Sequence, residues 1–253
     1  MFTAIQPELN KIFDNLENDY ALKSGHLSKF IPDFTECPVD TSLRPALLTL
    51  AAKIFHGFNE KCLVMAVVVQ LIHLAQEIHN RIPDDCPKET PQFPVLVGDY
   101  LFSKFFKRLS DFHLLEWLAP LASTICKMNE GGIVRREVIE SGRGREEDYL
   151  DVLHLEYGLL TGLSCKIGGV LAGCSEVQAG ILEQFGLNLG MAWGTMKEQY
   201  PLAPGDFLNT ARKYLLKIPG GEARQVMMSI IDEMEERAFR FSGQQGKVLY
   251  HAL

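Results

Sequence analysis

The sequence lacks an excess of positive charge. Its 253 residues include 25 Lys and Arg against 32 Asp and Glu, which gives a formal net charge of −7. A chain of this charge has no general electrostatic attraction for nucleic acid or for an anionic membrane surface. The densest basic cluster lies within residues 135–147, where glutamates balance the arginines. This mixture predicts a solvated loop.

Paired cysteines and long hydrophobic runs are also missing. The six cysteines include no C-x-x-C pair, and the N-terminal stretch has no basic segment followed by an apolar core. We therefore expect reduced thiols, no signal peptide and a cytoplasmic location. The longest apolar run, residues 62–75, contains Gln70 and His73. It is too short for a membrane span, so it predicts a buried core helix and no transmembrane segment.

Alternating strand patterns, internal repeats and low-complexity tracts are absent as well, whereas helical periodicity recurs along almost the whole chain. Pro45 predicts a helix start, Gly57 and Gly173 predict helix ends, and Gly131-Gly132 predicts a break. The expected helices cover roughly residues 5–22, 44–57, 61–82, 95–111, 113–130, 146–172, 175–198, 204–217 and 221–241. Together they predict a single all-α domain over residues 1–253.

The expected helix 61–82 changes character along its length. Its first half is apolar on every side from Val64 to Ile72, which predicts a position at the centre of a bundle. Its second half carries polar residues at spacings of three and four, which places them on one face. These residues are His73, Glu77, Asn80, Arg81 and Asp84. Either the helix emerges into solvent there, or this face lines the mouth of a cavity.

Five stretches occur in an order that matches a known family. They are SLRPALLTLAAKIFHG (42–57), QLIHLAQEIHNRIPDD (70–85), VLVGDYLFSKFF (95–106), EYGLLTGLSCKIGGVLAG (156–173) and FGLNLGMAWGTMKEQ (185–199). In that order they resemble the G-K-R-x-R-P, D-D-x-x-D, G-D-Y/x-L-L-A, K-T-A/G-x-L and F-G-x-x-L-G-x-A-F-Q-x-x-D-D segments of the trans-isoprenyl diphosphate synthases, or polyprenyl synthetases. The resemblance covers about residues 40–200. It implies an all-α, isoprenoid-synthase-type helical bundle around a central cavity, usually as a dimer.

The resemblance also implies a chemistry. Active members of the family ionise an allylic diphosphate, and isopentenyl diphosphate traps the carbocation before a proton leaves. Two Asp-rich motifs on facing helices hold the Mg²⁺ ions that bind the leaving diphosphate, because hard cations need several oxygen ligands. Lys and Arg side chains bind the second substrate, because phosphate recognition needs fixed positive charge.

This sequence departs from the family at the metal-binding positions. The two leading acids of the first Asp-rich motif fall on Asn80 and Arg81, and only the last acid remains, as Asp84. The Asp-Asp pair of the second motif falls on Lys197 and Glu198. Two remaining carboxylates beside two cations do not hold several divalent ions. We therefore expect no catalytic residue and no cofactor on this chain, with Mg²⁺ only on a catalytic partner.

The phosphate-binding positions change too, whereas the packing positions remain. Of the basic residues in G-K-R-x-R-P only Arg44 survives, and the K-T pair becomes Glu156-Tyr157. The small and packing residues that remain are Gly98, Asp99, Gly158, Gly168, Gly186 and Gly190. The candidate positions of a vestigial substrate-binding cavity are Arg44, His73, Glu77, Asn80, Arg81, Asp84, Lys197 and Glu198.

Other chemistries find little support in the sequence. It has no G-x-S-x-G, no phosphate-binding P-loop and no Cys–His signature. His73 and Glu77 have the i, i+4 spacing of two metal ligands on one helix face, but the same spacing is more typical of a hydrogen-bonded pair. We expect the hydrogen-bonded pair.

Three functions are compatible with this pattern. The first is a non-catalytic or regulatory subunit of a heteromeric polyprenyl diphosphate synthase, since the chain resembles small subunits that lack Asp-rich motifs, notably component I of bacterial heptaprenyl diphosphate synthase. The second is a divergent active prenyltransferase that elongates an allylic diphosphate with isopentenyl diphosphate through unrecognised metal ligands. The third is a binding protein, in this case a homodimer, that keeps the cavity for an isoprenoid or another lipid without chemistry.

An aromatic-rich stretch at residues 98–118 predicts where a partner subunit binds. It holds more aromatic surface than one bundle face easily buries, and large rigid side chains of this kind anchor interfaces. The residues are Tyr100, Phe102, Phe105, Phe106, Phe112 and Trp117. The alternative is that all of them lie in the core of this chain.

Overall fold

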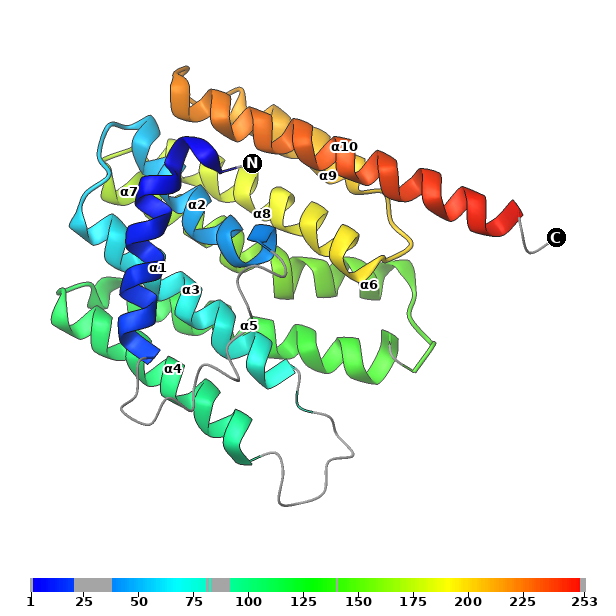
Figure 1. The fold of residues 1–253 in the computed structure, drawn as a ribbon, viewed down its shortest axis with the longest axis horizontal. Helices are drawn as coiled ribbons and strands as arrows, with labels where there is room; N and C mark the ends of the chain where they lie inside the picture. The colour runs from blue at the N-terminus through cyan, green and yellow to red at the C-terminus, as the bar shows by residue number, and fades with distance from the viewer. Residues whose placement is uncertain (1, 21–37, 81, 83–91, 140, 251–253) are drawn as a thin grey trace.

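The computed structural model describes residues 2–20, 38–80, 82, 92–139 and 141–250. Within these ranges all regular structure is helical, which confirms the predicted all-α class (Figure 1). The elements are η1 (Thr3–Ile5), α1 (Gln6–Tyr20), α2 (Pro38–Ile54), α3 (Glu60–Asn80), α4 (Gln92–Asp111), η3 (Leu115–Trp117), α5 (Leu118–Val134), η4 (Arg135–Ile139), α6 (Glu146–Val152), η5 (Leu153–Gly158), α7 (Leu159–Leu171), α8 (Glu176–Glu198), α9 (Pro204–Leu215) and α10 (Glu222–Tyr250).

α3 lies at the centre of the bundle, as its apolar first half predicts. Every side chain from Val64 to Gln76 is buried, and α1, α2, α4 and α7 all pack against this helix. By length and composition α3 could also cross a membrane, but 83% of its apolar window is buried inside the bundle. The prediction of a buried core helix is therefore confirmed.

α2 begins at Pro38, so the predicted helix start at Pro45 is wrong. Pro45 lies inside the helix, where it has no N–H to bond to the carbonyl four residues earlier. Packing offsets that loss, because residues 39–52 are buried along the whole helix. The additional N-terminal turns place Asp40 four residues before Arg44, on the same face.

The predicted break at Gly131-Gly132 is also wrong, because both glycines lie inside α5. A Cβ at Gly131 would come within 2.8 Å of the Cβ of Leu155, so this glycine permits a close helix approach and does not end the helix. The expected helix 146–172 instead contains the π-helical segment η5, between α6 and α7. Such wide turns are rare and change which face the following side chains occupy.

Retained glycines let α7 and α8 pack closely against neighbouring elements. A Cβ at Gly190 of α8 would lie 2.4 Å from the backbone oxygen of Tyr157, and one at Gly168 of α7 would lie 2.2 Å from that of Leu48 on α2. Only glycine allows backbones to approach so closely without displacement. α9 then covers α8, and α10 packs on α9 and α2, with its far half extending beyond the other helices (Figure 1).

The aromatic residues of the 98–118 stretch divide between the core and the surface. Phe105 is fully buried and Trp117 is nearly so, which corrects their place among the interface candidates. Tyr100, Phe102 and Phe112 are partly buried against the core, whereas Phe106 is 51% exposed. The division follows because α4 packs along α3 at the edge of the bundle, so that only part of its surface meets α3 (Figure 1).

Candidate functional site

Charged side chains from three helices meet beside the polar end of α3. Asp40 comes from α2, His73 and Glu77 come from α3, and Lys197 comes from the last turn of α8. The Lys197 Nζ lies 2.9 Å from Asp40 Oδ2 and 3.2 Å from Glu77 Oε1, and His73 Nε2 lies 3.7 Å from Asp40 Oδ2. Asp40 and His73 are only 6% and 3% exposed. We call these four residues, with Arg44 and Trp193, the Asp40 cluster.

The two oxygens of Asp40 have different partners. Oδ1 accepts a hydrogen bond of 2.8 Å from Trp193 Nε1 and lies 3.8 Å from Arg44 Nη1. Oδ2 faces Lys197 and His73. Arg44 also donates to the backbone oxygen of Asp40 at 3.1 Å. The carboxylate is therefore fixed on one side by neutral and cationic donors, and its other oxygen is directed toward the ammonium group.

The ionisation states follow from this arrangement. Burial alone would raise the pKa of the Asp40 carboxyl, but the contact with His73 and the positive charges of Arg44 and Lys197 outweigh burial and hold the pKa far below its usual range. Burial and the Arg44 charge together lower the pKa of His73, so its imidazole is neutral at pH 7. Burial also opposes the charge on Lys197, yet Glu77 and Asp40 raise its pKa above 10.5. The cluster thus balances two carboxylates with two cations.

A second group of polar residues lies next to the Asp40 cluster. Glu156, in η5, is buried and accepts hydrogen bonds of 3.2 Å at both oxygens from Arg135 Nε. Burial raises the pKa of Glu156 even though Arg135 opposes this. Tyr157 donates to Glu198 Oε1, and the Lys197 Nζ lies 5.5 Å from the centre of the Tyr157 ring, a cation–π contact.

Four of the sequence-predicted positions meet in the Asp40 cluster: Arg44, His73, Glu77 and Lys197. Glu198 joins the neighbouring group through Tyr157. Asn80 turns toward α5 instead, where its Oδ1 accepts from Gln76 Nε2 at 3.3 Å and lies near the Gly132 position. Arg81 and Asp84 lie outside the described residues, so their placement stays a prediction.

The sequence reasoning missed Asp40, Trp193 and Arg135. Asp40 was hidden because Pro45 indicated a later helix start, although an acid four residues before Arg44 is a recognisable i, i+4 pair. Arg135 contradicts the expectation of a solvated loop, because it belongs to the helical segment η4 and pairs with buried Glu156. Arg136 likewise donates to the backbone oxygen of Ile82 at 3.1 Å.

The predicted pairing of His73 with Glu77 is not what the structure favours. Asp40 is the acid that lies closest to His73, and Glu77 pairs with Lys197. One ligand atom from each of Asp40, His73 and Glu77 nonetheless lies within 4.8 Å of the others. The three side chains therefore lie close enough together to hold one cation, and the Lys197 ammonium pairs with two of them, Asp40 and Glu77.

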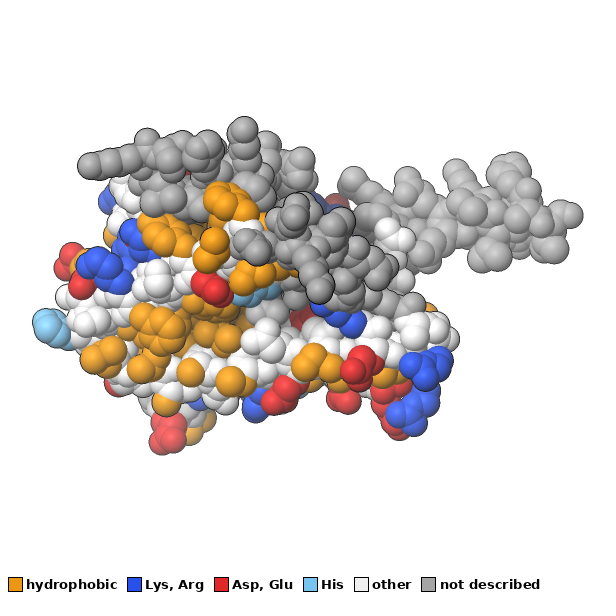
Figure 2. All heavy atoms as spheres, turned by 90° about the horizontal axis from the view of Figure 1, so that it is seen from below, with side chains coloured by type: hydrophobic (Ala, Val, Ile, Leu, Met, Phe, Trp, Pro, Cys, Tyr) orange, Lys and Arg blue, Asp and Glu red, His pale blue; other side chains and the backbone are white. Residues whose placement is uncertain are grey.

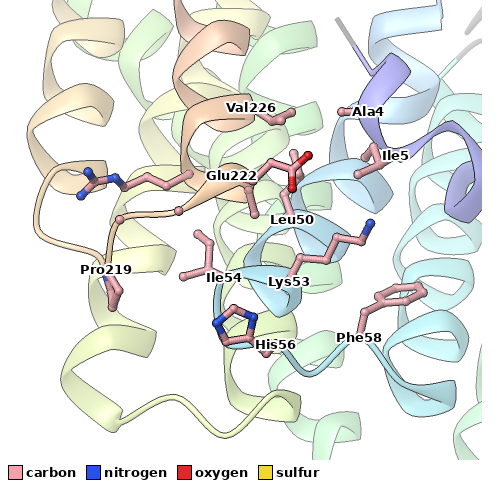
Figure 3. Close-up of a pocket in the computed structure, with 14 residues that line it drawn as sticks. Ala4, Ile5, Leu50, Lys53, Ile54, His56, Phe58, Pro219, Glu222 and Val226 are labelled. Atoms are coloured by element: carbon pink, nitrogen blue, oxygen red, sulfur yellow. The ribbon is translucent and has the colours of Figure 1, made fainter.

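A pocket of about 420 Å³ lies at the opposite end of α2. Figure 3 shows residues from η1, the end of α2 and the start of α10 around it. Its Lys53 pairs with Glu8, and its Arg224 donates to the backbone oxygen of Ile218 at 2.7 Å. Since Leu50 and Lys53 follow Asp40 by 10 and 13 positions on α2, about 15–20 Å of helix separate this pocket from the cluster.

The chain belongs to the polyprenyl synthetase family, whose model matches residues 41–196. It is similar to the geranylgeranyl diphosphate synthase of Methanosarcina mazei, with 27% identity over 76% of this chain and 67% of the relative. It is also similar to heptaprenyl diphosphate synthase component 2 of Geobacillus stearothermophilus, with 25% identity over 76% and 63%. The chain spans between about half and two thirds of the length of the curated relatives it matches.

Solved structures of the same family confirm the isoprenoid-synthase-type helical fold. The geranyl diphosphate synthase small subunit from Antirrhinum majus superposes with a TM-score of 0.70 at 19% identity, over 90% of this chain and 96% of that structure. At this identity the likeness concerns the fold alone. The chemistry must be argued from the residues of the Asp40 cluster and its neighbours.

Proposed function

We propose that the chain is a non-catalytic or regulatory subunit of a heteromeric polyprenyl diphosphate synthase in isoprenoid biosynthesis. The observation that carries this proposal is the position of Lys197. Its ammonium lies between α3 and α8, the helices on which the resemblance places the two Asp-rich motifs, and it pairs with Asp40 and Glu77. Carboxylates that a lysine already neutralises are poor ligands for Mg²⁺.

The electrostatics next to the cluster support the same proposal. The family lysine that would bind a diphosphate corresponds to Glu156 here, and Arg135 is engaged with both oxygens of that acid. Glu198 is held by Tyr157. A diphosphate approaching this region would meet carboxylates, and cations that already pair with carboxylates. Phosphate sites need available positive charge. The catalytic partner would therefore supply both Asp-rich motifs and the Mg²⁺.

The names of two similar proteins support a multi-subunit assembly. One is a component 2 of a heptaprenyl diphosphate synthase, and the other is a small subunit of a geranyl diphosphate synthase. A two-fold assembly built from related chains can exchange one copy for a different subunit without changing the geometry of the interface. We propose that this chain takes the place of one copy in such a pair, in the cytoplasm.

The outer side of α4 is the face on which we expect the partner to bind. Leu96 and Phe106 are exposed on this side at 62% and 51%, and Leu115 of η3 follows at 55%. Figure 2 views the side where α4 and α5 lie in Figure 1 and shows apolar side chains gathered across it. Exposed apolar surface of this kind marks protein interfaces.

Co-expression with a catalytic polyprenyl diphosphate synthase from the same genome tests the function. We expect the two chains to co-purify, and the complex to elongate an allylic diphosphate to a product length different from that of the catalytic chain alone. The isolated chain should show no Mg²⁺-dependent turnover. Turnover by the isolated chain would favour a divergent prenyltransferase, and a homodimer that co-purifies with a lipid but binds no synthase would favour the lipid-binding function.

A pair of charge substitutions tests the interface. Phe106→Asp should abolish co-purification with the catalytic chain, because it places a charge in the proposed apolar contact. Val177→Asp is the matched control, since Val177 is 74% exposed at the start of α8, on a different element. If a folded Phe106→Asp chain binds the synthase as well as the control does in sedimentation, the interface lies elsewhere. Phe105 is unsuitable for this test because it is fully buried.

A further inference from the structure

The Asp40 cluster contains a potential set of metal ligands that is separate from the family's Asp-rich positions. One nitrogen of His73 and one carboxylate oxygen from each of Asp40 and Glu77 lie within 4.8 Å of one another. Nothing in this set comes from Asn80, Lys197 or Glu198, the described positions to which the resemblance assigns the two motifs. A cation already lies in the set, because the Lys197 Nζ is 2.9 Å from Asp40 and 3.2 Å from Glu77.

We propose that Asp40, His73 and Glu77 form a binding site for a borderline divalent cation such as Zn²⁺ or Co²⁺, which the Lys197 ammonium occupies and which accepts the metal once that ammonium is removed. One imidazole nitrogen and two carboxylate oxygens are a donor set that suits Zn²⁺ and Co²⁺. Mg²⁺ takes oxygen ligands and water in an octahedral arrangement, so it suits this set less well.

Neighbouring side chains hold the proposed ligands in place. Trp193 and Arg44 fix one side of the Asp40 carboxylate and leave Oδ2 directed toward the cation. Partners of this kind orient metal ligands in proteins. His73 is buried, and its Nε2 lies 3.7 Å from Asp40 Oδ2, so the imidazole faces the carboxylate oxygen that would bind the same ion. An ion pair between lysine and the two acids would need no imidazole beside it.

The spacing of the two carboxylates reflects the size of the present cation. Contacts of 2.9 and 3.2 Å to an ammonium would shorten to about 2.0–2.2 Å around Zn²⁺. Each carboxylate oxygen therefore has to move inward by about 1 Å, and the rotatable side chain of Glu77 can accommodate most of this movement. Lys197 is 26% exposed, so its removal also opens a path from solvent for the metal and its water ligands.

Titration of the purified Lys197→Met chain with Co²⁺ tests this proposal, because Co²⁺ bound by protein ligands gives visible absorption bands. We expect one Co²⁺ per chain with an imidazole-ligand spectrum, displacement by one equivalent of Zn²⁺, and a rise in melting temperature on binding. The wild-type chain should bind Co²⁺ at least about tenfold more weakly, and so should Lys197→Met/His73→Gln, which lacks the nitrogen ligand. Mg²⁺ should not displace the bound Co²⁺.

Two outcomes would overturn the proposal. Equal Co²⁺ affinity in the wild-type and Lys197→Met chains would mean that the ammonium does not occupy the site, and no binding by a folded Lys197→Met chain would mean that the three ligands do not form one. If Lys197→Met does not fold, Lys197→Gln carries the same test, because its shorter neutral side chain also removes the cation while it keeps hydrogen-bond donors near the acids. Circular dichroism establishes folding in each case.

Discussion

The body of α8 and its last turn meet the rest of the molecule in different ways. Along the body, Gly186 and Gly190 bring the helix against the backbone of η5 and α7, and an added Cβ would come within 2.6 and 2.4 Å of backbone oxygens. In the last turn, Lys197 and Glu198 reach partners on α2, α3 and η5 through side chains. The backbone contact of the body admits only glycine, whereas the side-chain contacts of the last turn depend on which charges lie opposite.

This difference explains why a family pattern can persist in one part of a helix and disappear in the next. A backbone-to-backbone contact cannot be replaced by another side chain without moving a helix. An electrostatic contact can be rebuilt with new residues as long as the buried charges remain balanced. The backbone contacts of the α8 body preserve the fold. The last turn of α8 can therefore carry a cation where the family carries acids.

The largest effect on stability should come from adding a methyl group at the close contact between α8 and η5. Gly190→Ala should lower the free energy of unfolding by about 3 kcal/mol, because its Cβ meets the Tyr157 backbone oxygen. Gly180→Ala, on the same helix, has open space around its Cβ and should raise stability by up to about 1 kcal/mol through helix propensity. Denaturant unfolding measures both. Equal effects of the two substitutions would contradict the close backbone contact at Gly190.

A smaller loss should follow from removing the cation in the last turn. Lys197→Met leaves Asp40 and Glu77 without their shared partner, which should destabilise the chain by about 2 kcal/mol. Lys166→Met is the matched control, because Lys166 pairs with Glu183 at the surface between α7 and α8 and should cost about 0.5 kcal/mol or less. A Lys197→Met chain as stable as this control would show that the Asp40 cluster contributes little to folding.

The pH dependence of stability should reveal the buried acid beside the cluster. Burial raises the pKa of Glu156 above 4.5, so the folded chain binds a proton on this group more tightly than the unfolded chain does. Lowering the pH from 7 toward 4.5 should therefore stabilise wild type relative to Glu156→Gln, which binds no proton there. Parallel unfolding curves across this range give the difference. A difference that stays constant, or that changes in the opposite direction, would refute the assignment.

The smallest effect concerns how often the contact between α7 and α8 at Gly186 opens, which the reactivity of the native cysteines can report. Cys165 on α7 is fully buried against the Gly186 position, and burial raises the pKa of its thiol. Cys126 on α5 is exposed. A thiol reagent should modify Cys165 about 10³-fold or more slowly than Cys126, since it must wait for local unfolding. Mass spectrometry of single-cysteine variants measures the ratio, and comparable rates would mean that α7 and α8 separate readily.

Much of the fold could be predicted from the sequence, because its clearest patterns are compatible with few structures. The apolar run from Val64 to Ile72 has one stable environment, the bundle centre, and the retained glycines mark backbone contacts. Helix boundaries were harder to predict where a single proline or glycine was the only indication. Pro45 and Gly131 are tolerated inside helices here because tertiary packing outweighs their local preference.

The candidate site could be predicted only in part, because its contacts join distant segments. The sequence placed His73 and Glu77 on one face of α3, and it singled out Lys197 from the family pattern. It could not show that Lys197 reaches Asp40, 157 positions earlier, because a lysine side chain has many conformers and tertiary geometry selects one of them. Arg135 and Glu156, 21 positions apart, meet only because η4 and η5 both lie against α5.

The covalent attachment of the Lys197 ammonium has a consequence for how the chain matures. A free ion binds according to its concentration, whereas a tethered group has an effective concentration set by its attachment. The counter-ion of Asp40 and Glu77 is therefore synthesised with the polypeptide and needs no ion from the surroundings. We therefore expect the pairing of Lys197 with Asp40 and Glu77 to form together with the fold at the junction of α2, α3 and α8, whatever the magnesium concentration.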